Sequence, residues 1–162
     1  MIFVGDISLP SKKSIQLLNF PPLIYKQLLF GNLEGGIVDN SNNLFQKKRG
    51  VFNDINAIEQ LTKDFNFNGF SLANNHITDL SSISETIGCL DKLNIGFCGI
   101  GVNLKDSSKP LIFDDNGIRV IILNFGWEVI QCELVSNNKA GVNPLLKKHV
   151  LSVLKETITK YP

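Results

Sequence analysis

The sequence predicts an α/β fold in which a largely parallel β-sheet is flanked by helices. Short apolar runs that end in glycine or a polar residue alternate with longer segments whose apolar residues recur every three or four positions. Strands separated by helices in this way pair in parallel through right-handed crossovers. A chain of 162 residues, 43% of them hydrophobic and 19% charged, is long enough to bury a sizeable core. We therefore expect one α/β domain over residues 1–162.

Four strands of the predicted sheet are apolar runs that stop at polar or glycine-rich turns. They cover residues 1–4, 28–30, 70–73 and 95–98. Between the first two, residues 11–20 predict a weak helix that ends before Pro21 and Pro22, because proline cannot continue a helix.

Two further helices separate the later strands. The first is expected to be capped by Asn53, and its apolar face comprises Ile55, Ile58, Leu61 and Phe65. The second begins at Ser82, which forms a capping box with Glu85. Its apolar face comprises Ile83, Ile87, Leu90 and Leu93.

The last third of the chain predicts a hairpin and a final helix. Asn116-Gly117 between the apolar runs 110–113 and 118–125 is a strong hairpin signal. Asn143 is expected to cap the last helix and Pro144 to begin it, with apolar positions at Leu146, Val150, Val153, Leu154 and Ile158. Because an α/β pattern ordinarily continues with another strand, we expect the fold to be incomplete at its C-terminal end. The uncovered sheet edge then predicts a dimer.

Charge and cysteine content argue against several classes of protein. With 16 basic and 15 acidic residues, the net charge of +1 supplies no long-range attraction for nucleic acid. The dense basic cluster at 47–49 is expected to be a solvated loop. Cys89, Cys98 and Cys132 are widely spaced and form no CxxC motif, so we expect small buried side chains in a reducing compartment.

The amino terminus and the hydropathy of the chain predict a cytoplasmic location. No apolar stretch approaches the roughly 20 residues of a spanning helix. Asp6 follows the first apolar run at once, which is not typical of a signal peptide. Peripheral membrane association is left open.

Polar side chains follow three predicted strands at their carboxyl ends, the edge where open α/β sheets bind ligands. They are Asp6; Asn32 and Glu34; and Asn74, Asn75, His76 and Asp79. Carboxylate, amide and imidazole ligands together suit a divalent metal of the manganese, iron or zinc type. Such a metal can polarise a phosphoryl oxygen while a nearby histidine donates a proton. Each segment alone is also typical of a turn or cap, so the prediction rests on all three.

Three segments give the chain a specific resemblance. Gly5-Asp6-Ile7, Asn32-Leu33-Glu34 and the stretch from Ser71 through Asn74-Asn75-His76 to Asp79 resemble the bacterial capsule biosynthesis protein family of the CapA type. Residues 96–101 and 141–144 match as well, as do Thr86 and Leu90. The resemblance implies a calcineurin-like, metallophosphatase-like layered sheet and an association with poly-γ-glutamate capsule synthesis.

The resemblance also implies roles for individual residues. Metal ligands would be Asp6, Glu34 and Asn75; catalytic residues His76 and Asp79; and substrate-binding residues Asn32 and Asn74. If the alignment shifts by two positions, Asn32 replaces Glu34 as a ligand. Asp79 either orients His76 or caps a helix.

Two departures from the metallophosphatase pattern limit that expectation. Asp6 is followed by Ile7 and Ser8 instead of forming an Asp-x-His pair. The sequence contains only His76 and His149, and the second lies on the predicted final helix, where we expect it to be partly exposed. We therefore expect this chain alone to bind metal weakly and to have little activity.

Three functions remain open from the sequence. The first is a metal-dependent phosphoesterase acting on a phosphoester or polymer substrate in capsule or exopolymer synthesis. The second is a non-catalytic component that binds the polymer-synthesis machinery, which the missing Asp-x-His pair favours. The third is a nucleotide- or sugar-binding module, although neither a P-loop nor GxGxxG occurs. Trp127 either lines a substrate groove or, as we expect, packs at a sheet edge.

Overall fold

A computed structural model of the chain describes residues 1–11, 27–39, 50–65 and 67–162. The helix predicted over residues 11–20, the proline pair that follows it and the basic cluster at 47–49 lie outside the described residues.

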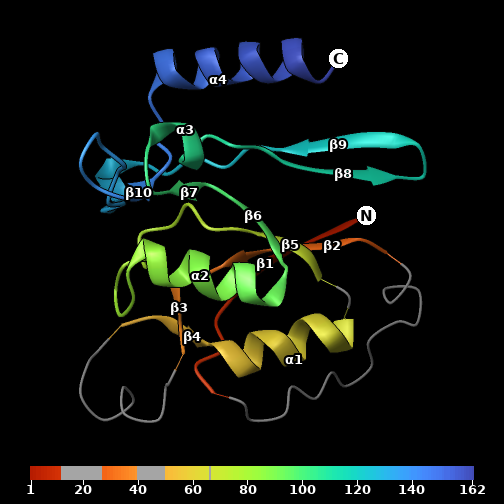
Figure 1. Cartoon of the computed structure of the whole chain (residues 1–162), viewed down its shortest axis with the longest axis vertical. Coiled ribbons are helices and arrows are strands. Elements are labelled where there is room, and N and C mark those ends of the chain that lie inside the picture. The colour runs from red at the N-terminus through yellow and green to blue at the C-terminus, as the bar shows by residue number, and fades with distance from the viewer. Residues whose placement is uncertain (12–26, 40–49, 66) are drawn as a thin grey trace.

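A four-stranded parallel sheet, in the order β1-β2-β5-β6, forms the centre of the fold (Figure 1). The strands are β1 (Ile2–Ile7), β2 (Leu29–Leu33), β5 (Phe67–Ser71) and β6 (Gly96–Cys98). This pairing confirms the predicted α/β class and the parallel sheet. β1 is longer than predicted, so Asp6 lies inside the strand, where it pairs with Asn32 on β2. Asn32 in turn pairs with Ser71 on β5, which aligns the carboxyl ends of the three strands.

Helices α1 (Ile55–Phe65) and α2 (Ile83–Leu93) lie toward the lower side of the sheet in Figure 1. The buried positions of α1 include all four predicted apolar residues. The core that they form with the sheet includes Leu29, Leu33, Phe70, Leu72, Ile77 and Leu90. The capping box of Ser82 and Glu85 is present as predicted.

The predicted cap of α1 was wrong by one residue. Asp54 Oδ1 accepts hydrogen bonds from the backbone N–H groups of Asn56 and Ala57 at 2.8 and 3.2 Å. Asn53 is fully buried instead, and its amide accepts from Leu9 N and donates to Glu34 O. Both residues fit the cap pattern, and the tertiary contacts of Asn53 decide between them.

Three two-stranded sheets complete the strands. β3 (Gly36–Val38) pairs in parallel with β4 (Phe52–Asp54), and β7 (Ile100–Gly101) pairs antiparallel with β10 (Gly141–Val142). The predicted hairpin is confirmed as β8 (Leu111–Asp115) and β9 (Ile118–Ile122). Its turn has positive φ at Asn116 (55°) and Gly117 (82°), which matches the twist of the strands.

The last helix, α4 (Lys147–Lys160), begins three residues after the predicted start. Asn143 is not its cap, because that side chain is 1% exposed and bonds to Ser108, to Asn124 and to the His149 ring, not to a backbone N–H group of the helix. Leu146 occupies the N-cap position without a side-chain hydrogen bond. The predicted apolar face was also largely wrong: Val153 is buried, but Leu146, Leu154 and Ile158 are exposed.

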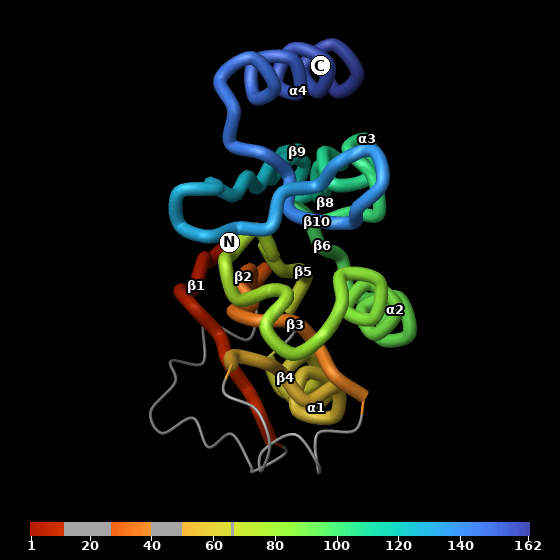
Figure 2. Tube along the Cα trace, turned by 90° about the vertical axis from the view of Figure 1, so that its left-hand side faces the viewer, coloured from red at the N-terminus to blue at the C-terminus, as the bar shows by residue number. Residues whose placement is uncertain are grey.

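Short elements connect these parts, namely the helix α3 (Leu104–Ser107) and the 3₁₀ turn η3 (Glu128–Ile130). The hairpin and α4 lie on the side of the sheet opposite α1 and α2 (Figures 1 and 2). Among the described residues, no helix combines the length and apolar character needed to cross a bilayer.

Candidate functional site

Asp6, Asn32 and Glu34 form one hydrogen-bonded group at the carboxyl edge of the sheet. The Nδ2 group of Asn32 donates to Asp6 Oδ1 at 2.8 Å and to Glu34 Oε2 at 2.7 Å. The strand register explains the contact, because Asp6 and Asn32 are paired across β1 and β2 and Glu34 follows β2 directly. One amide nitrogen therefore separates two carboxylates.

His76 joins this group from the loop after β5. Its Nε2 lies 3.9 Å from Glu34 Oε1, which is too long for a hydrogen bond. Its Nδ1 lies 2.9 Å from Asp79 Oδ2, and the same carboxylate oxygen accepts a hydrogen bond from Val51 N at 2.9 Å. An ionised carboxylate is only an acceptor, so Nδ1 of His76 carries a proton and donates it to Asp79, while Nε2 is the ring atom that faces Glu34.

The predicted substrate residue Asn74 holds this loop in place. Its side chain is 6% exposed, and its Oδ1 accepts from Gly35 N at 3.3 Å and from His76 N at 3.1 Å. Its Nδ2 donates to Leu33 O at 2.8 Å. Asn74 thus ties the His76 loop to the turn after β2, where Gly35 adopts a positive φ of 81°. Substrate contact by Asn74 stays a prediction.

Asn75 differs from its neighbour. It is half-buried, and its amide makes no hydrogen bond to any residue in the described part of the chain. It is therefore the amide of this loop that is available to a ligand. The structure does not bring it into the hydrogen-bonded group of Asp6, Asn32 and Glu34.

Two asparagines support the site in a way that the sequence did not predict: Asn124, which was not singled out, and Asn143, which was expected to be a helix cap. Asn124, after β9, accepts a hydrogen bond from Ala73 N at 2.6 Å and so fixes the residue before Asn74. Its carbonyl accepts from Asn143 Nδ2 at 2.9 Å. Asn124 lies inside the apolar run 118–125 that predicted the second hairpin strand, and because β9 ends at Ile122, Asn124 follows the strand as the other site residues follow theirs.

Cys132 and Trp127 lie on the segment after Asn124. Burial raises the pKa of the Cys132 thiol, and the negative charge of Glu34 contributes to this shift. Trp127 is 49% exposed, so the prediction that it packs at a sheet edge was wrong. Groove lining, the other alternative for Trp127, stays open.

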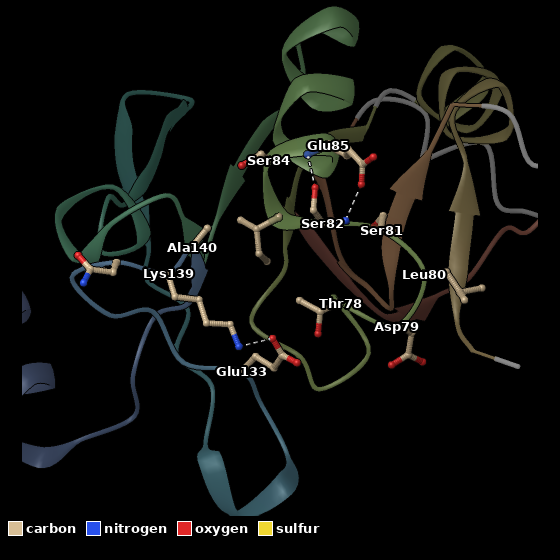
Figure 3. A pocket seen from close by; sticks show the side chains of 12 residues that line it. Thr78, Asp79, Leu80, Ser81, Ser82, Ser84, Glu85, Glu133, Lys139 and Ala140 are labelled. Carbon is tan, nitrogen blue, oxygen red and sulfur yellow. Dashed lines mark hydrogen bonds and ion pairs between the residues drawn. The ribbon is translucent and has the colours of Figure 1, made fainter. Parts of the chain in front are cut away.

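A cleft of about 560 Å³ opens beside Asp79 (Figure 3). It is lined by residues 78–85 together with Glu133 and residues 138–140. Lys139 is paired with Glu133 at 2.7 Å, and Ser82 with Glu85 in the capping box. Asp79, Glu85 and Glu133 outnumber the one lysine, so the potential in this cleft favours neutral or cationic groups.

The donor set of the site suits a divalent cation in type but provides few ligands. Two carboxylates face one point, which in this structure is taken by the N–H groups of Asn32. A half-turn of that amide would present its Oδ1 and give three oxygen atoms. In the part of the chain that the structure describes, no three His, Cys, Asp or Glu residues form a group that could hold a metal. The oxygen donors therefore match a divalent cation in type but are too few to define a metal site, and metal binding stays a prediction.

Comparison with known proteins identifies similar sequences over most of the chain. A family model described as bacterial capsule synthesis protein PGA_cap matches residues 20–160. The PGA biosynthesis protein CapA of Bacillus subtilis (strain 168) is 25% identical over 136 residues, which cover 76% of this chain and 36% of that protein. The capsule biosynthesis protein CapA of Bacillus anthracis is 29% identical over 138 residues, covering 79% and 33%. The chain thus spans about a third of the length of these relatives.

Proposed function

The chain belongs to the bacterial capsule synthesis protein family. On that premise, we propose that it carries a metal-dependent, phosphoesterase-like site. This site would serve in the biosynthesis of a capsule polymer, which is poly-γ-glutamate or a related exopolymer. The observation that supports this most directly is the convergence of Asp6, Asn32 and Glu34 beside His76, whose far side is held by Asp79.

The carboxylates of Asp6 and Glu34 would hold the metal, with an amide oxygen from Asn75 or from a rotated Asn32. A divalent ion held there supplies positive charge that polarises a phosphoryl oxygen. The ligand count is low, so we expect manganese or zinc to bind more weakly than micromolar.

The chain's own residues supply orientation and a proton. Asp79 fixes the His76 ring by its bond to Nδ1, which leaves Nε2 as the atom that takes up or releases a proton next to the carboxylates. Asn74 and Asn124 hold the loop that carries His76 and so limit the movement of this atom. Substrate would approach from the side of Asn75, whose amide has no hydrogen-bond partner among the described residues.

Isothermal titration with manganese tests the metal site, with Asp6→Asn as the variant and Asp64→Asn, on the exposed face of α1, as its control. We expect weak binding that Asp6→Asn abolishes and Asp64→Asn keeps. Micromolar or tighter binding would refute the weak-site prediction. Equal binding by the parent chain and Asp6→Asn would refute the assignment of Asp6.

Hydrolysis of p-nitrophenyl phosphate in the presence of manganese tests the chemistry. We expect a low rate for this chain that falls further in His76→Ala. A rate that is unchanged by this substitution would mean that His76 is not the proton-transfer residue. The same assay is run on the 162-residue chain and on one of the longer relatives, so that their rates of hydrolysis can be compared.

The second function is a non-catalytic component that binds the polymer-synthesis machinery. It is favoured by Ile7 and Ser8 after Asp6, where a metallophosphatase would have its ligand histidine. If a His76→Ala protein still supports polymer synthesis in cells while hydrolysis is undetectable, this second function is the correct one. A dimer formed through the uncovered sheet edge at the C-terminal end of the fold is a separate proposal. Light scattering that gives a monomer mass at high concentration would exclude it.

A further inference from the structure

A second cleft, of about 520 Å³, lies between α3 and α4. Figures 1 and 2 both show α3 and α4 on the side of the four-stranded sheet where the β8-β9 hairpin lies. None of the residues that line the cleft belongs to the candidate site at the sheet edge. Its volume is in the range that binds small organic molecules, for which about 300 to 1,000 Å³ is usual.

The charges of the cleft are predominantly positive. Lys105 and Lys109 come from the α3 side and Lys160 from α4, against one carboxylate, Glu156. Lys109 is paired with Asp106 at 2.7 Å, whereas Lys105 forms no salt bridge within the described ranges. Lys160 lies 5.1 Å from the centre of the Tyr161 ring. At least two ammonium groups are thus available to a ligand.

Two hydroxyl groups of the walls have no hydrogen-bond partner among the described residues and can donate to a ligand. The hydroxyls of Ser152 and Tyr161 form no hydrogen bond to a described residue. Ser108 Oγ, in contrast, donates to Leu104 O at 2.6 Å. Hydroxyls beside ammonium groups match a ligand that is rich in acceptor atoms.

His149 lines one wall of the cleft, and its Nε2 atom is already bonded to Asn143. Asn143 Nδ2 donates to Asn124 O, so the Oδ1 of Asn143 faces His149 and accepts from its Nε2 at 2.7 Å. This bond fixes the tautomer with the proton on Nε2. Leu104, Pro110 and Val153 supply an apolar surface in the same cleft.

We propose that the cleft between α3 and α4 binds a small organic anion. Its phosphate or carboxylate head lies between Lys105 and Lys160, and its apolar body lies against Leu104 and Val153. The charge complementarity of the two walls selects an anion, and the apolar surface selects a ligand larger than an inorganic ion. This site is separate from the proposed metal site and does not depend on it.

Amide chemical shifts of the ¹⁵N-labelled 162-residue chain test the proposal, with phenyl phosphate as the probe. Saturable shifts are expected at residues 104–110 and 149–161. Inorganic phosphate, which has the head alone, and phenol, which has the body alone, should each bind more weakly. Benzoate distinguishes the two anionic groups. If benzoate binds as tightly as phenyl phosphate, the site accepts a carboxylate as well as a phosphate, and if it binds more weakly, the site prefers a phosphate. Phenol that binds as tightly as phenyl phosphate overturns the anion assignment, as does the absence of shifts in both segments.

Charge removal gives the second test. The double variant Lys105→Gln, Lys160→Gln should lose at least about tenfold in affinity for phenyl phosphate, as expected when charge-assisted hydrogen bonds are removed. Lys155→Gln, on the same helix but outside the cleft lining, should change it by less than about twofold. Equal losses in the two proteins overturn the proposal. Raising the salt concentration from about 50 to about 500 mM should also weaken the binding of phenyl phosphate to the parent chain, but not the binding of phenol. If the affinity for phenyl phosphate is unchanged by salt, the proposal of an anion site is overturned.

Discussion

Asp79 Oδ2 lies 2.9 Å from His76 Nδ1 and accepts a hydrogen bond from Val51 N at the same distance. One carboxylate oxygen thus fixes the ring of His76 to the segment before β4. Because Asp79 can bond both groups only as an acceptor, the Nδ1 atom of His76 carries a proton in this arrangement. The residue that the sequence left between two roles, orienting His76 or capping a helix, has the geometry of the first.

Replacing Asp79 by alanine should shift the neutral His76 ring toward the tautomer with the proton on Nε2. Imidazole ¹⁵N chemical shifts measure this directly. Loss of the bond to Val51 should also lower the free energy of unfolding by about 1 kcal/mol. Asp91→Ala, on the exposed side of α2, is the matched control and should change neither quantity. An unchanged tautomer in Asp79→Ala would mean that another group orients the ring.

Asn32→Asp should make the fold dependent on divalent cations. The substitution replaces the N–H donor between Asp6 and Glu34 by a third carboxylate, and like charges at hydrogen-bond distance repel. We expect a lower melting temperature in EDTA and a larger rise on adding manganese than in the parent chain, because the new ligand set is richer in oxygen.

Asn137→Asp, in an exposed loop, is the control for the added charge in that experiment. It should melt like the parent chain in both buffers. A melting temperature of Asn32→Asp that manganese does not raise would show that the three oxygens do not converge on one ion.

Sequence patterns identified the elements whose signals are local. The capping box of Ser82 and the Asn116-Gly117 turn depend only on neighbouring residues, and both were correct. Asn53 and Asn143 have the same local pattern as a cap, yet both are buried and bond to distant segments. Tertiary hydrogen bonds decided these two positions, and no nearby residue signals them.

The same distinction applies to the site. Strand order alone predicts that Asp6, Glu34 and His76 approach one edge, because parallel strands end together. That Asn32 lies between the two carboxylates depends on the register of β1 against β2, with an irregularity between Val4 and Asp6. The periodicity of the sequence does not predict this shift in the strand register. The support from Asn124 depends on where the hairpin packs, which is equally non-local.

Ser82→Ala should lower the free energy of unfolding by about 1 kcal/mol. Ser82 Oγ accepts from Glu85 N at 3.1 Å, and Glu85 returns a bond to Ser82 N at 2.7 Å, so the substitution removes one of two reciprocal bonds. Urea unfolding measures the change. Ser84→Ala, two residues into the same helix and exposed, should cost far less. Equal losses would show that the helix start is fixed by packing and not by the cap.

His149 should make stability fall at mildly acid pH. Burial lowers its pKa below the ordinary value of 6.5, so the unfolded chain takes up a proton at a higher pH than the folded chain. The stability associated with the neutral ring is therefore present above pH 6.5 and is lost as the pH falls from that value through the folded pKa. Melting temperatures between about pH 7.5 and pH 5 should fall less steeply in His149→Gln than in the parent chain or in Lys148→Gln. Parallel curves for all three proteins would contradict this.

The three thiols should be inert in the folded chain. Cys89, Cys98 and Cys132 are at most 4% exposed, and burial raises the pKa of each, that of Cys98 to about 12. Since the thiolate is the reactive form, iodoacetamide at pH 8 should modify almost none of them until urea unfolds the chain, after which mass spectrometry should find three adducts. Slow reaction without urea reports local opening, and Cys132, in an irregular segment, should then react before Cys98, which lies in β6. Rapid native modification of Cys98 would contradict the burial of that strand, whereas modification of Cys132 alone would place the opening next to Glu34 and the candidate site.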